Sequence, residues 1–266
     1  MHTRPDVDLT PRVVDLRDQV EFRAPGGQIG IGIVAPFDLA LDREYWRWAP
    51  DQVWLYVTRT PFVDQPVGVS LAEALSDEAV VAQATRDLRI PDPAVTVYAC
   101  TSGSFVHGLV GEERLRRAME AAGARRAITT SGALLEALDA LGAHRVGVGT
   151  PYDAAATAKL ADFLAEAGYE VRTTAYLGLT SDIFRVSNET VRRLATTADD
   201  AAADVVFLSC TNLWTFDVLA ELEQRLHKPV LSANQVTMWA ALRAAGVWPE
   251  HVDQHLFQLR PEPTPA

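Results

Sequence analysis

Short apolar runs rich in β-branched residues recur along the chain and predict its strands. Most of these runs are continuously apolar, which is typical of parallel strands that are covered on both faces. The predicted strands are Ile29–Val34, Val53–Val57, Val95–Cys100, Ala127–Thr129, Arg145–Val148, Val171–Tyr176, Val205–Cys210 and Pro229–Leu231.

Stretches rich in Ala, Leu, Glu and Arg lie between the predicted strands and indicate helices. Ser70 and Glu73 form a capping-box pattern at the start of the first stretch. A glycine follows three of the others and supplies the left-handed residue that ends a helix. The alternation of strands and helices predicts an α/β architecture with parallel sheets. The predicted helices are Ser70–Leu88, Glu112–Ala122, Leu134–Leu141, Asp153–Ala167, Phe216–Leu226 and Val236–Ala245.

Two strand ends repeat one pattern about half a chain apart. Val95–Ser102 (VTVYACTS) and Val205–Asn212 (VVFLSCTN) each contain an apolar strand, a small residue, Cys-Thr and a small polar residue. This repeat favours two similar lobes over one doubly wound sheet or a barrel. We therefore expect two four-stranded parallel sheets, flanked by helices and related by pseudo-twofold symmetry. The first lobe is predicted to hold residues 1–128 plus 234–266, and the second residues 129–233.

The composition narrows the classes of partner. The chain has 24 Lys and Arg against 35 Asp and Glu, a net charge of −11. A surface with this excess of negative charge repels nucleic acid and anionic membranes. No apolar run approaches the roughly 18 residues of a membrane span, and Met1–Val20 lacks the apolar core of a signal peptide. We expect a cytoplasmic protein that binds neither nucleic acid nor membrane, with its two cysteines reduced.

The two cysteine turns are the candidate chemistry. Ligands of α/β folds bind at the carboxyl ends of strands, where both cysteines lie. Free N–H groups there would bind a carboxylate and lower a thiol pKa from about 8.5 to about 3.5–7.5. Two thiols facing one substrate could work on its opposite sides without a metal or an organic cofactor. The alternative is a pair of small buried hydrophobes, but the matching Cys-Thr contexts favour catalysis.

Five further segments occur in a characteristic order along the chain. They are Cys100–Phe105 (CTSGSF), Thr129–Leu135 (TTSGALL), Gly149–Asp153 (GTPYD), Ser209–Leu213 (SCTNL) and Lys228–Gln235 (KPVLSANQ). Together they resemble the maleate cis–trans isomerase and arylmalonate decarboxylase branch of the aspartate/glutamate racemase superfamily, from about residue 30 to residue 246. The resemblance implies two similar α/β lobes with the site between them, cofactor-independent chemistry, and a homodimer or higher homo-oligomer.

The resemblance also implies roles for individual residues. Cys100 matches a cysteine of the isomerases and racemases that the decarboxylases replace with glycine, and Cys210 matches a cysteine common to both. Tyr152 matches a tyrosine whose hydroxyl binds the substrate carboxylate. The residues that match the carboxylate-holding turns are Thr101, Ser102, Thr211 and Asn212.

One position departs from the family pattern and bears on the substrate. Pro36-Phe37-Asp38 stands where maleate isomerases have Pro-Ser-Ser-Asn, whose Asn contacts substrate. Asp38 would repel a dicarboxylate unless it is protonated or paired, which leaves room for one carboxylate plus a donor or cationic group. The predicted function is a cofactor-independent isomerase of a small carboxylic acid substrate. It would act by cysteine addition to an activated C=C or by two-base proton transfer. The alternatives are an amino-acid or hydantoin-type racemase, an arylmalonate-decarboxylase-like decarboxylase and a non-catalytic carboxylate-binding protein.

Overall fold

The computed structural model describes residues 13–21 and 28–259, and their strands form two four-stranded parallel sheets. The first sheet has the order β2-β1-β3-β4 and the second β6-β5-β7-β8, so the predicted two-lobed α/β fold is confirmed. Each predicted strand exists with ends within two residues of those expected. The strands are β1 (Ile29–Ala35), β2 (Val53–Arg59), β3 (Val95–Tyr98), β4 (Ala127–Thr129), β5 (Arg145–Thr150), β6 (Glu170–Tyr176), β7 (Val205–Leu208) and β8 (Val230–Ser232).

The two sheets have the same connectivity, since the order 2-1-3-4 of the first recurs in the second as 6-5-7-8. β3 and β7 therefore occupy equivalent places, each beside the first strand of its sheet. β3 pairs with β1 through Ile31 and Val95, and β7 pairs with β5 through Val146 and Val205. The two cysteines follow these equivalent strands, each two residues beyond the strand end.

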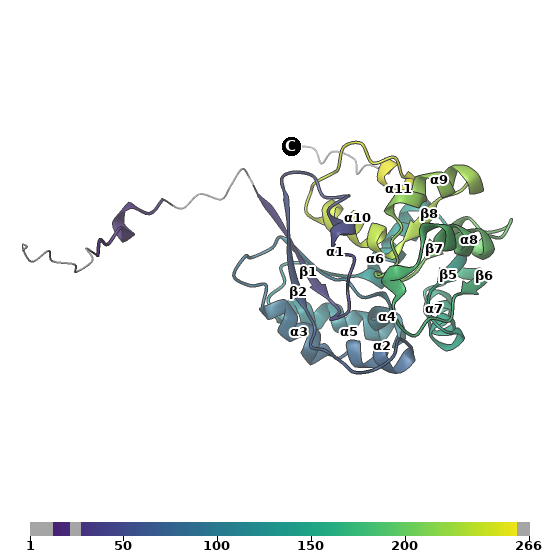
Figure 1. Ribbon diagram of the computed structural model, residues 1–266, viewed down its shortest axis with the longest axis horizontal. Helices are drawn as coiled ribbons and strands as arrows, with labels where there is room; N and C mark the ends of the chain where they lie inside the picture. Colours follow the sequence, from purple (N-terminus) through teal and green to yellow (C-terminus); the bar gives the residue numbers. More distant parts are fainter. Residues whose placement is uncertain (1–12, 22–27, 260–266) are drawn as a thin grey trace, which may run out of the picture.

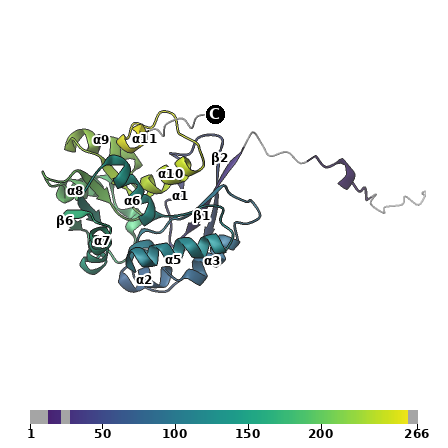
Figure 2. The same ribbon diagram turned by 180° about the vertical axis from the view of Figure 1, so that it is seen from behind.

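Helices cover the sheets and join them. In Figure 1, α6 and α10 lie between the two sheets, and α10 contacts β3 and β4 of the first sheet as well as β8 of the second. Figure 2 shows α3 and α5 side by side against the first sheet. The helices are α1 (Asp42–Tyr45), α2 (Val69–Leu75), α3 (Glu78–Arg86), α4 (Thr101–Phe105), α5 (Gly108–Ala121), α6 (Thr130–Leu141), α7 (Ala154–Glu166), α8 (Asn188–Ala198), α9 (Phe216–Leu226), α10 (Ala233–Ala244) and α11 (His255–Gln258), with short 3-10 turns η1 (Arg17–Gln19) and η3 (Ile183–Arg185).

The alternation of side chains along the first sheet divides the core in two. Ile31 and Ile33 of β1 face a large core that continues into the second lobe. Val34 and Tyr98 face a smaller cluster with residues of α2, α3 and α5, and Cys100 belongs to this cluster. Because successive strand residues point to opposite faces, the register of β1 and β3 decides which core each side chain enters.

Four helix predictions were wrong in detail. Two of these helices begin four residues earlier than expected, α5 at Gly108 instead of Glu112 and α6 at Thr130 instead of Leu134. The stretch Ser70–Leu88 forms two helices, because the Asp77 side chain accepts hydrogen bonds from Ala79 N and Val80 N and so caps a new helix, α3. The expected capping box of Ser70 and Glu73 is absent, since α2 begins directly after Gly68 and no side chain caps it. A capping box does form elsewhere, between Ser232 and Gln235 at the start of α10, which begins three residues before the predicted Val236.

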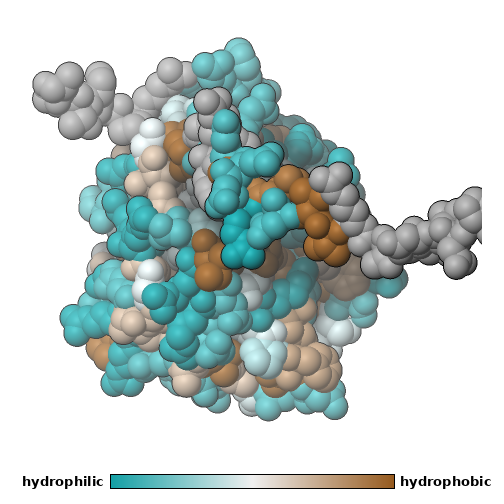
Figure 3. Space-filling model, turned by 90° about the vertical axis from the view of Figure 1, so that its left-hand side faces the viewer, coloured by the Kyte–Doolittle hydropathy of each residue, from teal (hydrophilic) through white to brown (hydrophobic). Residues whose placement is uncertain are grey.

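The surface carries apolar residues in small groups. Trp54 and Val57, on the edge strand β2, are each partly exposed, and Figure 3 shows hydrophobic residues interspersed among hydrophilic ones on one face. Among the described residues, none of the helices has the length and apolar character needed to cross a bilayer. The lobe boundaries 1–128 plus 234–266 and 129–233 stay a prediction.

Candidate active site

The two cysteine turns meet at one cavity of about 30 Å³. All of the residues that the sequence singles out for the site line it, although they come from both lobes and lie up to 174 residues apart. The fold therefore assembles the predicted constellation in one place. The lining residues are Pro36, Asp38, Val67, Leu71, Leu75, Cys100, Thr101, Ser102, Tyr152, Ile183, Cys210, Thr211 and Asn212.

Cys100 lies between β3 and α4 and is 4% exposed. The chain packs closely around its sulfur because position 103 has no side chain. A Cβ at Gly103 would lie 2.6 Å from Tyr98 Oη and 3.1 Å from Cys100 Sγ. The Tyr98 hydroxyl donates to the carbonyl of Leu75, which fixes the wall of the cavity beside the thiol.

Cys210 has an unusual backbone conformation for a residue with a side chain. Its φ is +94°, a region that costs L-residues on the order of 1–3 kcal/mol and that persists only where the surroundings enforce it. The side chain is 8% exposed, and the N–H of Asn212 donates to its sulfur at 3.4 Å. The turn thus aims the thiol into the cavity at a cost in conformational free energy.

Burial dominates the ionisation of both thiols. It raises the pKa of Cys100 to about 11 and that of Cys210 to about 12, and the negative charge of Asp38 adds to both increases. The expected lowering of the thiol pKa was wrong, because loss of hydration outweighs the hydrogen bonds from the Gly103 and Asn212 backbone. At neutral pH both buried thiols are therefore protonated and can act as acids.

Hydroxyl groups beside the thiols are available to an oxygen ligand. Thr101 is 2% exposed, and its Oγ1 has no hydrogen-bond partner within residues 13–21 and 28–259. Ser102 Oγ lies 4.0 Å from Cys100 Sγ. The Tyr152 hydroxyl lies 3.4 Å from Ser209 Oγ, and burial raises its pKa well above the ordinary value, so this group stays a donor. A buried polar atom without a partner is costly, and a bound carboxylate would satisfy it.

Asp38 and Asn212 join the two lobes at the edge of the cavity. Asn212 Nδ2 donates to the Asp38 carbonyl at 3.0 Å, and Asn212 Oδ1 accepts from Ala40 N at 2.8 Å. Burial raises the pKa of the Asp38 carboxyl, which Arg59 opposes by its charge. Arg59 itself donates to the carbonyls of Phe37 and Leu39. The Asn212 side chain therefore holds the loop after β1 against the turn that carries Cys210.

A sequence model of the arylmalonate decarboxylase family matches residues 48–255, most of the chain. The chain belongs to this family. Within it, the arylmalonate decarboxylase of Bordetella bronchiseptica is 34% identical over 193 residues, which cover 70% of this chain and 80% of that protein. A maleate isomerase of Pseudomonas putida is 29% identical over 160 residues, or 57% of this chain and 64% of that protein. The chain thus lies in the predicted maleate isomerase and arylmalonate decarboxylase branch.

Solved structures of the family share the fold. A liganded variant of arylmalonate decarboxylase, with a glycine changed to cysteine and a cysteine to serine, superposes with a TM-score of 0.80 at 30% identity and covers 86% of this chain and 99% of that one. The maleate isomerase Iso of Pseudomonas putida S16 superposes with a TM-score of 0.76 at 23% identity over 86% of this chain and 98% of that one.

A second hollow adjoins the thiol cavity in this family member. It has a volume of about 170 Å³ and shares Asp38 and Asn212 with the cavity. Its outer wall comes from two loops that the Val67 N–H joins by donating to the Thr180 carbonyl at 2.8 Å. The side chains of Phe37 and Phe184 line it together with polar groups.

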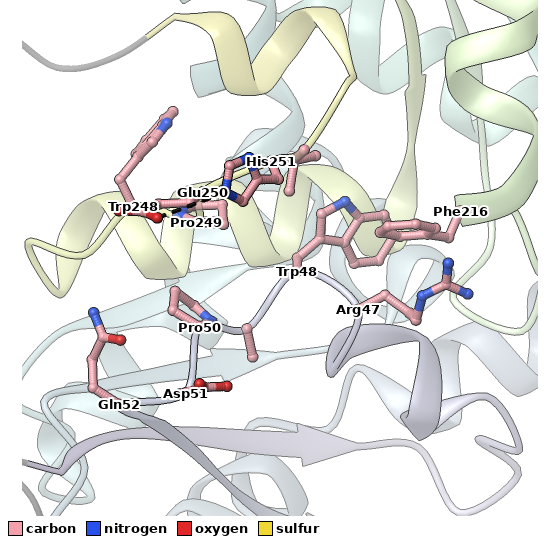
Figure 4. A pocket seen from close by; sticks show the side chains of 12 residues that line it. Arg47, Trp48, Pro50, Asp51, Gln52, Phe216, Trp248, Pro249, Glu250 and His251 are labelled. Carbon is pink, nitrogen blue, oxygen red and sulfur yellow. Dashed lines mark ion pairs between the residues drawn. The ribbon is translucent and has the colours of Figure 1, made fainter.

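A much larger cavity lies elsewhere, between the loop after α1 and the loop before α11 (Figure 4). It has a volume of about 510 Å³ and no thiol. Arg47 lies over the Phe216 ring at 4.0 Å and forms an ion pair with Asp217, and Trp48 Nε1 donates to Gln254. Its best-placed polar groups are already paired, so size alone does not identify the site.

Sequence reasoning missed Glu44 and Tyr45 of α1, which back the thiol cavity. Both are fully buried. Burial raises the pKa of the Tyr45 hydroxyl well above its ordinary value, and Glu44, Cys100 and Cys210 add to this by their charge. The signal available in the sequence was a short Asp-Arg-Glu-Tyr segment, in which nothing marks the glutamate as buried. Among residues 13–21 and 28–259, no three His, Cys, Asp or Glu side chains gather as a metal site would require.

Proposed function

We propose that the chain is a cofactor-independent isomerase that acts on a small carboxylic acid through Cys100 and Cys210. The observation that carries this proposal is the meeting of both thiols, from equivalent strands of the two sheets, in one cavity. Thr101 brings an unpartnered hydroxyl to the same cavity. Relatives named arylmalonate decarboxylase and maleate isomerase support chemistry at the carbon beside a carboxylate.

In the proton-transfer route, one cysteine first loses its proton to solvent. The resulting thiolate removes the proton from the carbon beside the carboxylate, and the C–H electrons form an enediolate. The hydroxyls of Thr101 and Tyr152 donate to the enediolate oxygens, as oxyanion donors do. The second thiol then gives its proton to the opposite face of the carbon. The product is the mirror-image centre, and the thiolate has moved from one side to the other.

In the addition route, the thiolate of Cys100 forms a C–S bond to one carbon of an activated C=C. The π electrons of that C=C then move toward the carboxylate and form the enediolate. The former double bond is now single and rotates. Expulsion of the thiolate restores the C=C in the trans geometry, while Cys210 supplies and regains a proton. The resting thiols are protonated, so either route starts from a minor ionised form, and kcat/KM should rise about tenfold per pH unit in the neutral range.

The charges around the cavity favour a substrate with one carboxylate. Of the described residues that line the cavity and the adjoining hollow, only Asp38 and Asp182 are charged. Asp182 is paired with Arg185. Arg59 acts on Asp38 by its charge, but its guanidinium donates to the Phe37 and Leu39 carbonyls. A second carboxylate would meet the Asp38 charge at close range. A group with an N–H donor would instead pair with Asp38.

Substrate incubations followed by proton NMR in D₂O test the proposal. The substrates are maleate and single enantiomers of small α-substituted monocarboxylates, including α-amino acids. Deuterium at the α-carbon with loss of optical purity indicates proton transfer, and a trans alkene indicates addition. Cys100→Ala and Cys210→Ala should each lower turnover about a thousandfold, or about 4 kcal/mol. Thr196→Ala, an equally small change on the exposed face of α8, should leave it unchanged. Full turnover by either cysteine variant refutes the two-thiol mechanism.

The second candidate is a decarboxylase, favoured by the 34% identity to an arylmalonate decarboxylase. A malonate would lose CO₂ by cleavage of one C–C bond, and the enediolate left behind would take its proton from Cys210, which regains one from water. Release of CO₂ from an α-aryl-α-methylmalonate measures this activity. The two functions differ in their need for Cys100. Decarboxylation should survive Cys100→Ala and fail in Cys210→Ala, whereas isomerisation fails in both.

A further inference from the structure

A buried carboxylate on α1 forms hydrogen bonds with the segment that follows the Cys210 turn. Glu44, on α1, is 0% exposed. Its Oε1 accepts from Thr215 N at 2.6 Å, from Thr215 Oγ1 at 3.0 Å and from Phe216 N at 2.6 Å. Its Oε2 accepts from Asn234 Nδ2. These donors belong to the start of α9 and the start of α10, which lie 171 to 190 residues away in sequence.

The same amide of Asn234 reaches the residue next to Cys210. Asn234 Nδ2 donates to the Thr211 carbonyl at 3.0 Å as well as to Glu44. The segment from Thr211 to Phe216 is therefore held at both ends by one carboxylate, directly at Phe216 and through Asn234 at Thr211. This segment follows Cys210, whose φ of +94° requires enforcement by its surroundings.

The energetics favour a bridge of this kind over chance packing. A carboxylate out of water is stable only where its oxygens are fully hydrogen-bonded, and this one accepts four bonds. Two of the donors are backbone N–H groups at the start of α9, an 11-residue helix whose N-terminal end favours negative charge. Without the carboxylate those N–H groups would be buried unpaired. The contact thus binds the two lobes at the point where they share a site.

We propose that Glu44 is a positioning residue that holds Cys210 in its strained, cavity-facing conformation through Asn234 and the Thr211 carbonyl. Glu44 does not line the thiol cavity and touches no substrate there. Its effect on turnover rests on the proposed function, whereas its effect on the reactivity of Cys210 does not. Among the described residues, none of the hydrogen bonds of this bridge involves Cys100, so the two thiols should respond differently to its loss.

Glu44→Gln cuts the bridge with little change in shape. The glutamine oxygen can still accept from Thr215 and Phe216, but its NH₂ group then faces the NH₂ group of Asn234, donor against donor. The full-length protein is alkylated with iodoacetamide at pH 9, and the rate at each cysteine is followed by peptide mass spectrometry. We expect Cys210 to react at least fivefold faster and Cys100 within twofold of the parent. Once a substrate is identified, Glu44→Gln should lower kcat at least tenfold relative to the parent and leave KM within threefold.

Thr215→Val is the matched control, because it removes a hydroxyl that lies within hydrogen-bond distance of Glu44 Oε1 and Ser232 Oγ and leaves Asn234 in place. It should lower the melting temperature and leave the Cys210 rate within twofold. If Glu44→Gln does not fold, Asn234→Ala removes the same bridge and is judged by the same criteria. The proposal is overturned by an unchanged Cys210 rate, by equal changes at both cysteines, or by an equal effect of Thr215→Val. The alkylation rates decide this even if no carboxylic acid is turned over.

Discussion

The raised pKa of each buried thiol predicts a specific loss of stability in alkaline solution. The folded protein holds the protons of Cys100 and Cys210 up to pH values of about 11 and 12, whereas the unfolded chain releases them near 9. Between those values the unfolded state binds fewer protons, so the free energy of unfolding falls as pH rises. The contribution of the thiols is complete below pH 9 and is lost above it.

The magnitude follows from the two pKa values. Each pH unit in this interval is worth about 1.4 kcal/mol per thiol, so the pair should lose roughly 3 kcal/mol between pH 7 and pH 10. Urea denaturation at half-unit pH steps measures the change, and the Cys100→Ala/Cys210→Ala double variant supplies the reference. Tyr45, Tyr98 and Tyr152, whose pKa values are also raised, are present in both proteins and cancel. A difference between the two proteins that does not vary with pH would refute the assignment of buried, protonated thiols.

Three further perturbations test separate contacts. Gly103→Ala places a methyl group 2.6 Å from Tyr98 Oη and should lower the free energy of unfolding by about 1–3 kcal/mol in urea denaturation; an unchanged midpoint would contradict the close packing. Lys228→Met leaves Asp199 without its ion-pair partner 2.8 Å away and should lower the free energy of unfolding by about 2 kcal/mol. A smaller loss in 1 M salt would show that the pair is exposed to solvent and screened. Asp38→Asn removes a negative charge that raises the pKa of both thiols, so the pH profile of their alkylation should move to lower pH. An unchanged profile would show that Asp38 lies too far away to act on them.

The strands and the shared cavity could be predicted because the signals for them are local. An apolar run followed by Cys-Thr recurs once in each lobe, and parallel strands bring their carboxyl ends to one side of a sheet. The position of Asp153 before an Ala-rich stretch likewise marks the start of α7, where its side chain accepts from Ala156 N. These features depend on neighbours in sequence.

Three features were not predicted from the sequence: the helix α8, the raised thiol pKa values and the role of Glu44. The first has a periodicity that was overlooked, and the other two depend on residues far away in sequence. α8 was not predicted, although Val191, Leu194 and Ala198 recur at helical spacing and Ser187 caps it. The thiol pKa depends on burial by segments far away, which no motif encodes. Glu44 was missed because its donors lie more than 170 residues downstream, and a glutamate between Arg and Tyr is ordinarily assigned to solvent.

The small volume of the thiol cavity has a consequence for any affinity measured on this protein. At about 30 Å³ it is roughly tenfold smaller than the pockets of about 300–1,000 Å³ that hold small ligands. A carboxylic acid therefore enters only a widened conformation, and the apparent dissociation constant equals the intrinsic one divided by the population of that conformation. Weak binding of a true substrate would then report the rarity of the receptive state and not poor complementarity. The hydrogen bond from the Val67 N–H to the Thr180 carbonyl joins two loops beside the cavity. Breaking it should raise the population of the widened conformation and so lower the apparent dissociation constant.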